Sequence, residues 1–333
     1  MTSVRIVGSA ALVPEGASPR WTRYQSFHTK PGARPNLPMV RRIDDWSPAQ
    51  YLGDKGWKFM NRSTQLLLSS LVLSLRGTSF LDPERSHFDA GVYVGSALGN
   101  KQTILDYDLL SRTEGPHTVS AKLGPVVLAN YPASSLAQGT RFRGPNLTFS
   151  AGSCSGAAAL ETALMHMNNG LVSKAIVASV EVVDEVQHKF LLAEGFEDKL
   201  VVESSCVFLL DGHLDESSVG VHVLNVRSST LDVTETIIIE CLAECGLRVP
   251  DLDVIIMPNG YSETISSMHE AYRLFASYAK PMYVLGAPGI DFYGGQVLIS
   301  VHYLSNLLAN GLACILSMDH RGLFSCAIVQ IRG

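Results

Sequence analysis

The sequence has little charge, no excess of basic residues and no long apolar run. Only 17% of its 333 residues are charged, and 26 basic residues against 31 acidic ones leave a net charge of −5. Surfaces that bind a nucleic-acid backbone carry clustered Lys and Arg, so nucleic acid is excluded as the main partner. No stretch approaches the roughly 20 apolar residues that a bilayer core requires, so no membrane span is predicted. These absences indicate a soluble globular protein.

The sequence also lacks the cysteine spacing of a zinc site or a disulfide framework. Its six cysteines lie in apolar stretches without a CxxC pair, which predicts no metal, no cofactor and a reducing, cytoplasmic location. The N-terminus lacks the charged start, the long apolar run and the cleavage site of a secretory signal. The cysteines are Cys154, Cys206, Cys241, Cys245, Cys314 and Cys326.

Apolar residues, in contrast, are plentiful. Apolar residues make up 46% of the chain and charged residues only 17%. A typical soluble domain has about 25% charged residues and therefore a more polar surface. Part of the surface is therefore expected to be covered by a partner.

Apolar runs of strand length alternate with helical patterns along the chain, which predicts an α/β fold in which helices cover sheets. A weak internal repetition predicts two similar halves, residues 1–215 and 216–333. Residues 14–50 are rich in Pro, Arg and Trp and are expected to form a long surface connection. The predicted helices are 63–75, 155–168, 234–245, 262–276 and 295–310, and the predicted strands are 4–7, 91–95, 146–150, 174–180, one ending near 210, 254–257, 282–285, 313–318 and 325–331.

The strongest signal is the turn Gly152–Gly156, which follows a β-type run and opens a helix. A strand, a sharp turn and a helix together expose one side chain beside unpaired N–H groups and the positive end of the helix dipole. Cys154 at such a turn would have its thiolate favoured, whereas Ser153 would need a neighbouring base. The first turns of the helix are almost wholly small, so the helix must pack against backbone at close range. GxCxG alone resembles the hydrolase elbow, a short and weakly specific pattern.

The longer stretch RGPNLTFSAGSCSGAAALETALMHMNNGLVSKAIVASVE, residues 143–181, closely resembles the nucleophile region of β-ketoacyl synthases of the thiolase superfamily. Other parts agree in order, strongly up to residue 181 and loosely afterwards: VRIVGSAALVPEG, RRIDDWSPAQYLGDKGWKFMNRSTQ, GVYVGSALGN, VIIMPNGYSET and GGQVLISVHYL. The resemblance implies a thiolase-like layered αβαβα fold built from two similar halves. Residues 1–215 would carry the nucleophile turn.

The catalytic residues of that family do not carry over to this sequence. The family's cysteine falls on Ser153, and Cys154 lies one residue later, where a helical step rotates the side chain by about 100°. The family's first histidine falls on Asn259 and its second near Pro288. Condensation needs a thiolate to carry the acyl chain and two imidazoles to stabilise the enolate. The resemblance therefore implies a chain that does not condense acyl units by itself.

Two further positions depart from the family pattern. The family's lysine falls near Tyr283, although Lys280 is close, and its Gly-Phe gate is replaced by something like His320, Arg321 and Gly322.

The leading hypothesis is a non-catalytic ketosynthase-like subunit, similar to the chain length factors of type II polyketide systems. The resemblance implies a heterodimer with an active ketosynthase, paired through Lys174–Val180, in which this chain shapes the acyl tunnel and an acyl carrier protein visits. The short region between that strand and residue 210 resembles the small partners of aryl polyene systems. A plainer alternative is a scaffold that only solubilises the ketosynthase.

A hypothesis of another class is an active acyltransferase or hydrolase that uses Ser153 or Cys154 as its nucleophile. His320 is the best candidate base because it falls in the family's C-terminal active-site loop, whereas His166 and His302 fall inside predicted helices and are expected to be structural. The remaining histidines considered are His188, His213, His222 and His269.

Overall fold

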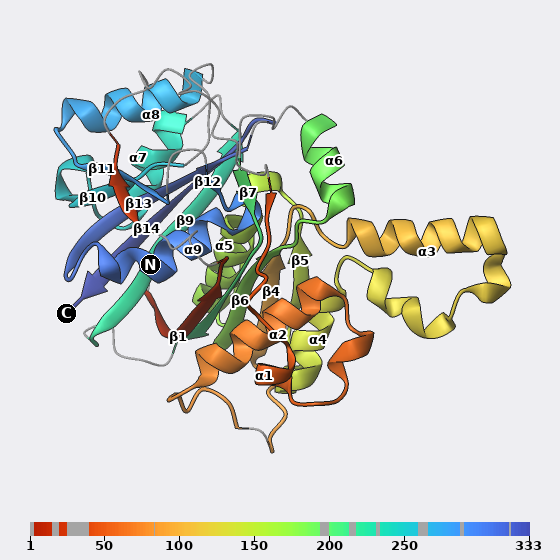
Figure 1. Ribbon diagram of the computed structural model, residues 1–333. Coiled ribbons are helices and arrows are strands. Elements are labelled where there is room, and N and C mark those ends of the chain that lie inside the picture. The colour runs from red at the N-terminus through yellow and green to blue at the C-terminus, as the bar shows by residue number, and fades with distance from the viewer. Residues whose placement is uncertain are drawn as a thin grey trace.

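The computed structural model describes residues 3–14, 20–24, 40–82, 84–193, 200–212, 218–230, 234–258, 266–286, 290–319 and 321–333. Within these ranges the chain forms an α/β fold with a long twisted sheet flanked by helices (Figure 1). The predicted boundary between the halves, at residues 215 and 216, lies outside the described residues. None of the described helices has both the length and the apolar character needed to cross a bilayer.

The two halves contribute strands in the same spatial order. When the five strands of a half are numbered in chain order, their order across the sheet is first, fifth, fourth, second and third. The fifth strand is antiparallel to both of its neighbours, and the others run parallel. The halves meet where β1 pairs antiparallel with β9. The first half uses β1 (Val4–Leu12), β4 (Ala90–Gly95), β5 (Asn146–Phe149), β6 (Lys174–Glu181) and β8 (Ser204–Asp211). The second uses β9 (Gly220–Thr230), β10 (Val254–Ile256), β11 (Met282–Leu285), β13 (Gly311–Met318) and β14 (Leu323–Arg332).

Helices form three layers around the two halves of the sheet. α5 (Ser155–Asn168) and α9 (Gln296–Tyr303) contact each other and strands of both halves, so they form the middle layer. α2 (Arg62–Leu75) and α4 (Tyr131–Thr140) cover the outer face of the first half. α7 (Thr234–Glu244), with α8 (Ser266–Ser277) packed on it, covers the outer face of the second. This is the layered αβαβα arrangement that the resemblance implied.

The elements arise from local sequence signals. α2 begins where the Asn61 side chain accepts the Thr64 N–H, and its Leu66, Leu67 and Leu71 are buried against the sheet. β6 is apolar on both faces because helices cover both sides, as its continuous apolar run predicted. These two predictions are confirmed.

Small residues let α5 approach its neighbours at backbone distance, as its composition predicted. A Cβ atom on Gly156 would lie 2.7 Å from the Gly294 carbonyl oxygen, ahead of α9. One on Gly95 of β4 would overlap the backbone of Ser155. Such contacts hold the start of α5 against both β4 and the chain leading to α9.

An arm projects from the body after β4 (Figure 1). It consists of α3 (Lys101–Glu114) and short 3-10 turns at Pro116–Thr118, Ala121–Leu123 and Pro125–Val127. No residue of α3 is buried, and its Ile104, Leu105 and Leu109 are between 45% and 55% exposed. The sequence analysis assigned no element here, because these apolar side chains face away from the core.

Three expectations are wrong. The described parts of residues 14–50 contain two short strands, because backbone pairing with β11 and with β7 (Leu200–Val202) holds them extended. The helix expected over 295–310 ends at Tyr303 and tightens into a 3-10 turn, since the chain turns back to begin β13 at Gly311. The strand Lys174–Val180 is an interior strand, paired on both sides, and has no edge for a partner.

The remaining elements complete the described fold. β2 (Trp21–Arg23) and β3 (Val40–Arg41) are the two short strands just mentioned, and β12 (Ile290–Asp291) and β7 join β3 in a small second sheet. α1 (Ala49–Leu52) precedes α2, and α6 (Glu185–Ala193) follows β6.

Candidate active site

The predicted nucleophile turn exists between β5 and α5. Residues Gly152–Cys154 form a 3-10 turn whose Gly152 has a φ of +53°, a conformation that glycine adopts without steric cost. A Cβ atom at Gly152 would overlap the carboxylate of Asp319, which lies at the end of β13. The turn therefore depends on glycine for both its backbone conformation and its contact with Asp319.

Ser153 is fixed by backbone hydrogen bonds from the second half of the chain. Its N–H donates to Asp319 Oδ2 at 2.9 Å, and its carbonyl oxygen accepts from Ser317 Oγ at 2.7 Å. Only 3% of Ser153 is exposed. Ser153, on which the family's nucleophile was predicted to fall, is thus part of a buried junction between the halves.

Cys154 is buried beside the next strands of the sheet. Its Sγ donates to Ser317 Oγ at 4.0 Å. Burial is the main cause that raises the pKa of Cys154 to about 11, and the charges of Asp319 and Glu161 add to the rise. The thiol is therefore protonated at neutral pH, whereas a nucleophilic cysteine must be a thiolate.

Buried acidic groups that the sequence analysis missed lie behind the turn. Glu181, at the end of β6, is fully buried and accepts the N–H groups of Ala97 and Leu98 at 2.7 and 2.9 Å. Burial raises its pKa to about 8. Asp291 accepts the N–H of Tyr293, whose φ of +47° is unusual for a residue with a side chain. A glutamate ending an apolar strand was the one signal available in the sequence.

Three of the candidate histidines have hydrogen-bond partners away from the turn. His166 Nδ1 lies 2.8 Å from the Tyr93 hydroxyl, and His302 Nδ1 lies 3.0 Å from Ser9 Oγ. His222 Nε2 is 2.7 Å from the Ser218 carbonyl oxygen within its own half. His166 and His302 are in helices, as expected. His188 is on α6, and His269 is on α8.

Four other candidate residues lie outside the described residues: Asn259, Pro288, His213 and His320. Their predicted roles stay predictions. Within the described residues, no group of three or more His, Cys, Asp or Glu side chains is placed to hold a metal ion.

Comparison with known proteins identifies the family. The sequence profile of the β-ketoacyl synthase N-terminal domain matches residues 15–193, more than half of the chain. The chain belongs to the β-ketoacyl synthase family. A search of curated proteins finds no match.

Solved structures resemble the chain over its whole length. The ishigamide ketosynthase/chain length factor is 19% identical, with a TM-score of 0.77 over 99% of this chain and 100% of that one. A chain of the AntDE:AntF structure, a type II PKS acyl-carrier protein in complex with its ketosynthase bound to the hexaketide, is 14% identical, with a TM-score of 0.75 over 99% of each chain. A β-ketoacyl synthase from Burkholderia phymatum STM815 is 12% identical, with a TM-score of 0.76 over 100% of both chains. These similarities establish a thiolase-like ketosynthase fold.

Proposed function

We propose that this chain is a non-catalytic ketosynthase subunit that pairs with an active β-ketoacyl synthase in a type II polyketide or related chain-elongation system. The observation that carries the proposal is the state of the nucleophile turn. Ser153 stands where the family has cysteine. The adjacent Cys154 is 1% exposed, has the Ser317 hydroxyl as its hydrogen-bond partner and has a pKa of about 11. Neither feature supplies the thiolate that condensation requires.

The pairing surface in this proposal is the free edge of β5. Within the described residues β5 pairs only with β4, and it is the last strand at that end of the sheet. Pro145 and Phe149 carbonyl oxygens accept N–H groups from the β4 side. Because backbone groups alternate along a strand, the N–H groups of Asn146 and Thr148 face outward. An unpaired edge of this kind is a template for a strand of another chain.

The arm contributes the apolar part of the same surface. Ile104, Leu105 and Leu109 of α3 are exposed, and Leu128 at the base of the arm is 55% exposed. Leu147 of β5 is also exposed. Exposed apolar groups gathered near one end of a sheet are typical of an interface. In the pair, the arm of this subunit would help to shape the space for the growing acyl chain, which an acyl carrier protein would deliver.

The type of pathway is the finer part of the proposal. The ishigamide structure is that of a ketosynthase/chain length factor, and the AntDE:AntF structure contains an acyl-carrier protein in complex with its ketosynthase. We place this chain in a comparable role in the cytoplasm, and assign it to an aryl polyene type system on the basis of its short region after β6.

A proline at the outer edge of β5 tests the pairing. Thr148→Pro removes an outward N–H group without removing a hydrogen bond to β4, whereas Thr148→Val keeps that N–H and serves as the control. Each variant is co-expressed with a candidate partner ketosynthase that recovers the wild-type chain, and the pair is recovered through a tag on the ketosynthase. We expect Thr148→Val to be recovered normally and Thr148→Pro to be lost while its circular dichroism stays unchanged. Recovery of folded Thr148→Pro at the normal level contradicts the proposed edge.

Acyl labelling tests the lack of catalysis. The chain is incubated with an acyl carrier protein that holds a radiolabelled acyl group, alone and with the ketosynthase. We expect the label on the ketosynthase only, and the Ser153→Ala variant is expected to leave product formation by the pair nearly intact. Label bound to this chain through Ser153 or Cys154 would instead establish the acyltransferase or hydrolase alternative.

A further inference from the structure

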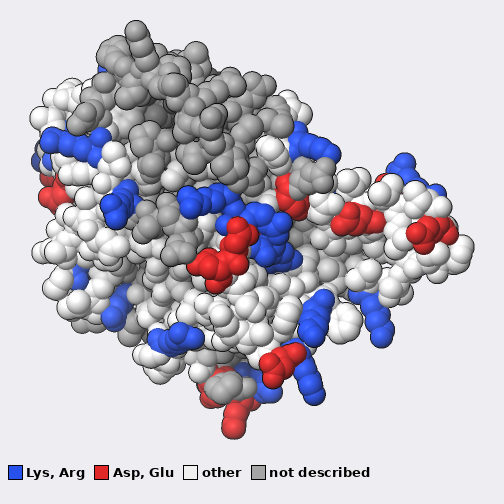
Figure 2. Space-filling model, viewed as in Figure 1, with Lys and Arg blue, Asp and Glu red and all other residues white. Residues whose placement is uncertain are grey.

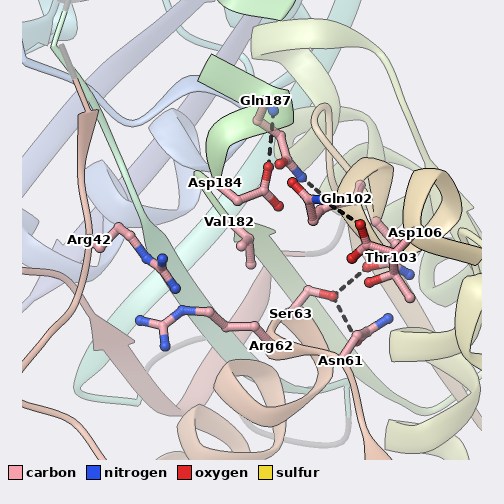
Figure 3. Close-up of a pocket in the computed structure, with 12 residues that line it drawn as sticks. Arg42, Asn61, Arg62, Ser63, Gln102, Thr103, Asp106, Val182, Asp184 and Gln187 are labelled. Atoms are coloured by element: carbon pink, nitrogen blue, oxygen red, sulfur yellow. Dashed lines mark hydrogen bonds between the residues drawn. The ribbon is translucent and has the colours of Figure 1, made fainter. Parts of the chain in front are cut away.

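A polar cleft lies between the starts of α2, α3 and α6, away from the nucleophile turn (Figure 3). Its volume is about 470 Å³, within the range of small-molecule sites. Among the described residues that line it, Val182 has the one aliphatic side chain. Hydrogen-bonding or charged side chains make up nearly all the rest, so the cleft suits a polar ligand and not an acyl chain.

The cleft has basic groups on one side and acidic groups on the other. Figure 3 shows Arg42 and Arg62 together, across the cleft from Asp106 and Asp184. On the molecular face seen in Figure 2, in contrast, basic and acidic side chains are intermingled, without a large patch of one sign. A ligand with separated charges of both signs is complementary to such a cleft, and a simple anion or cation is not.

The two arginines differ in how firmly they are held. Arg62 Nε and Nη2 donate to the two carboxylate oxygens of Glu203, each at 2.6 Å, and Arg62 also donates to the Ile43 carbonyl oxygen. Its charge is thus largely compensated. Among the described residues, no hydrogen bond or ion pair within 4 Å holds the exposed Arg42 side chain. Arg42 is therefore the group available for a carboxylate.

The opposite side offers acceptors. Gln187 is 1% exposed and lines the cleft, and its Oε1 has no hydrogen-bond partner in the described structure. Its Nε2 donates to the Gly99 carbonyl oxygen at 3.4 Å. A buried acceptor without a donor is unfavourable, and a ligand N–H group would satisfy it.

Asp184 lies next to this acceptor. Asp184 Oδ1 accepts the N–H groups of Val186 and Gln187 at the start of α6. Burial raises the pKa of Asp184 and the charge of Asp106 adds to the rise, whereas the hydrogen bonds from Gln187 and Val186 and the charge of Arg42 oppose it. A cation placed beside these carboxylates would be stabilised by both.

We propose that this cleft binds a small zwitterion of the amino acid class, with its carboxylate at Arg42 and its ammonium group between Gln187 Oε1 and Asp184. Gln102, Thr103 and Asp106 of the cleft belong to α3, the arm that also contributes to the proposed pairing surface, whereas no residue of β5 lines the cleft. The Thr148 variants test the pairing and the Arg42 variant tests the cleft, so each proposal has its own experiment. No covalent step is involved.

Calorimetric titration with the free proteinogenic amino acids tests the site, on the chain alone or, where it is obtained only as a pair, on the complex. The matched probes for the amino acid that binds best are its decarboxylated amine and its deaminated acid. We expect saturable binding of at least one amino acid and weaker binding of both probes. Binding that is absent for all amino acids, or equally strong for either probe, overturns the proposal.

Variants assign the binding to this cleft. Arg42→Gln and Gln187→Met each remove one proposed hydrogen bond to a charged group, which corresponds to about a tenfold to hundredfold loss of affinity. Arg76→Gln, at an exposed arginine after α2, is the control and is expected to bind as the wild type does. Unchanged affinity of Arg42→Gln, a surface variant that leaves the core intact, refutes the assignment even if Gln187→Met does not fold.

Discussion

Replacing Glu181 by glutamine tests how the interior behind the nucleophile turn is stabilised. Both carboxyl oxygens of the fully buried Glu181 accept a backbone N–H, one from Ala97 and one from Leu98. Glutamine keeps one acceptor oxygen but places its NH₂ group against the other N–H. The lost hydrogen bond and the buried unsatisfied donor are expected to lower the free energy of unfolding by about 1–3 kcal/mol at low pH.

The same substitution reverses its effect as the pH rises. Burial raises the pKa of Glu181 from its ordinary value of 4.5 to about 8 in the folded protein. Below the pKa of 4.5 that Glu181 has in the unfolded chain, the carboxyl group is protonated in both the folded and the unfolded state, and its contribution to stability is fully present. Between the two values, the unfolded chain releases a proton that the folded chain keeps, so the free energy of unfolding falls by about 1.4 kcal/mol per pH unit. The total loss in the free energy of unfolding is on the order of 5 kcal/mol, and it is complete above the pKa of Glu181 in the folded protein.

Urea unfolding of the wild type and Glu181→Gln, at several pH values, measures this difference. Other titrating groups are common to both proteins and cancel in the comparison. We expect the wild type to be the more stable near about pH 5 and the variant near about pH 8. Glu114→Gln, at an exposed position that ends α3, is the control and is expected to follow the wild type. A difference between wild type and Glu181→Gln that does not change with pH would refute the reasoning.

Three shorter predictions concern other buried contacts. Iodoacetamide is expected to modify Cys154 only after unfolding, because burial and a pKa of about 11 leave almost no accessible thiolate at neutral pH; rapid native alkylation seen by mass spectrometry argues against this. Gly156→Val forces side-chain atoms onto the backbone ahead of α9 and is expected to destabilise by about 1–3 kcal/mol; an unchanged thermal midpoint contradicts the close contact. Arg62→Ala leaves Glu203 buried without its guanidinium and is expected to destabilise by about 3–5 kcal/mol; a loss below 1 kcal/mol in urea unfolding would show the pair to be dispensable.

Local patterns in the sequence predicted the fold class and most of its regular elements. The leucines of α2, the small residues of α5 and the apolar run of β6 each specify an element whose burial matches the pattern. The turn at Gly152–Cys154 was predicted for the same reason, since its glycines and flanking runs are contiguous in the chain.

The rest of the candidate site depends on residues distant in sequence. Asp319 and Ser317 reach the Ser153 backbone across more than 160 positions, and Glu181 is placed by loop N–H groups from the chain after β4. A pattern of nearby residues does not predict contacts between residues so far apart in the sequence. The direction of the Cys154 side chain, toward the Ser317 hydroxyl, was likewise decided by the strand that carries this serine, β13.

The sequence by itself determined that this chain is an α/β protein of the β-ketoacyl synthase family, and it predicts a serine at the position of the nucleophile. Only the tertiary structure decided which strand lies at the edge of the sheet, because an apolar run looks the same whether its backbone hydrogen bonds are made on one side or on both. It therefore placed β6 inside and β5 at the edge. The polar cleft was decided in the same way, since its walls come from the starts of three helices and from the chain after β3 and β6, which meet only when the chain is folded.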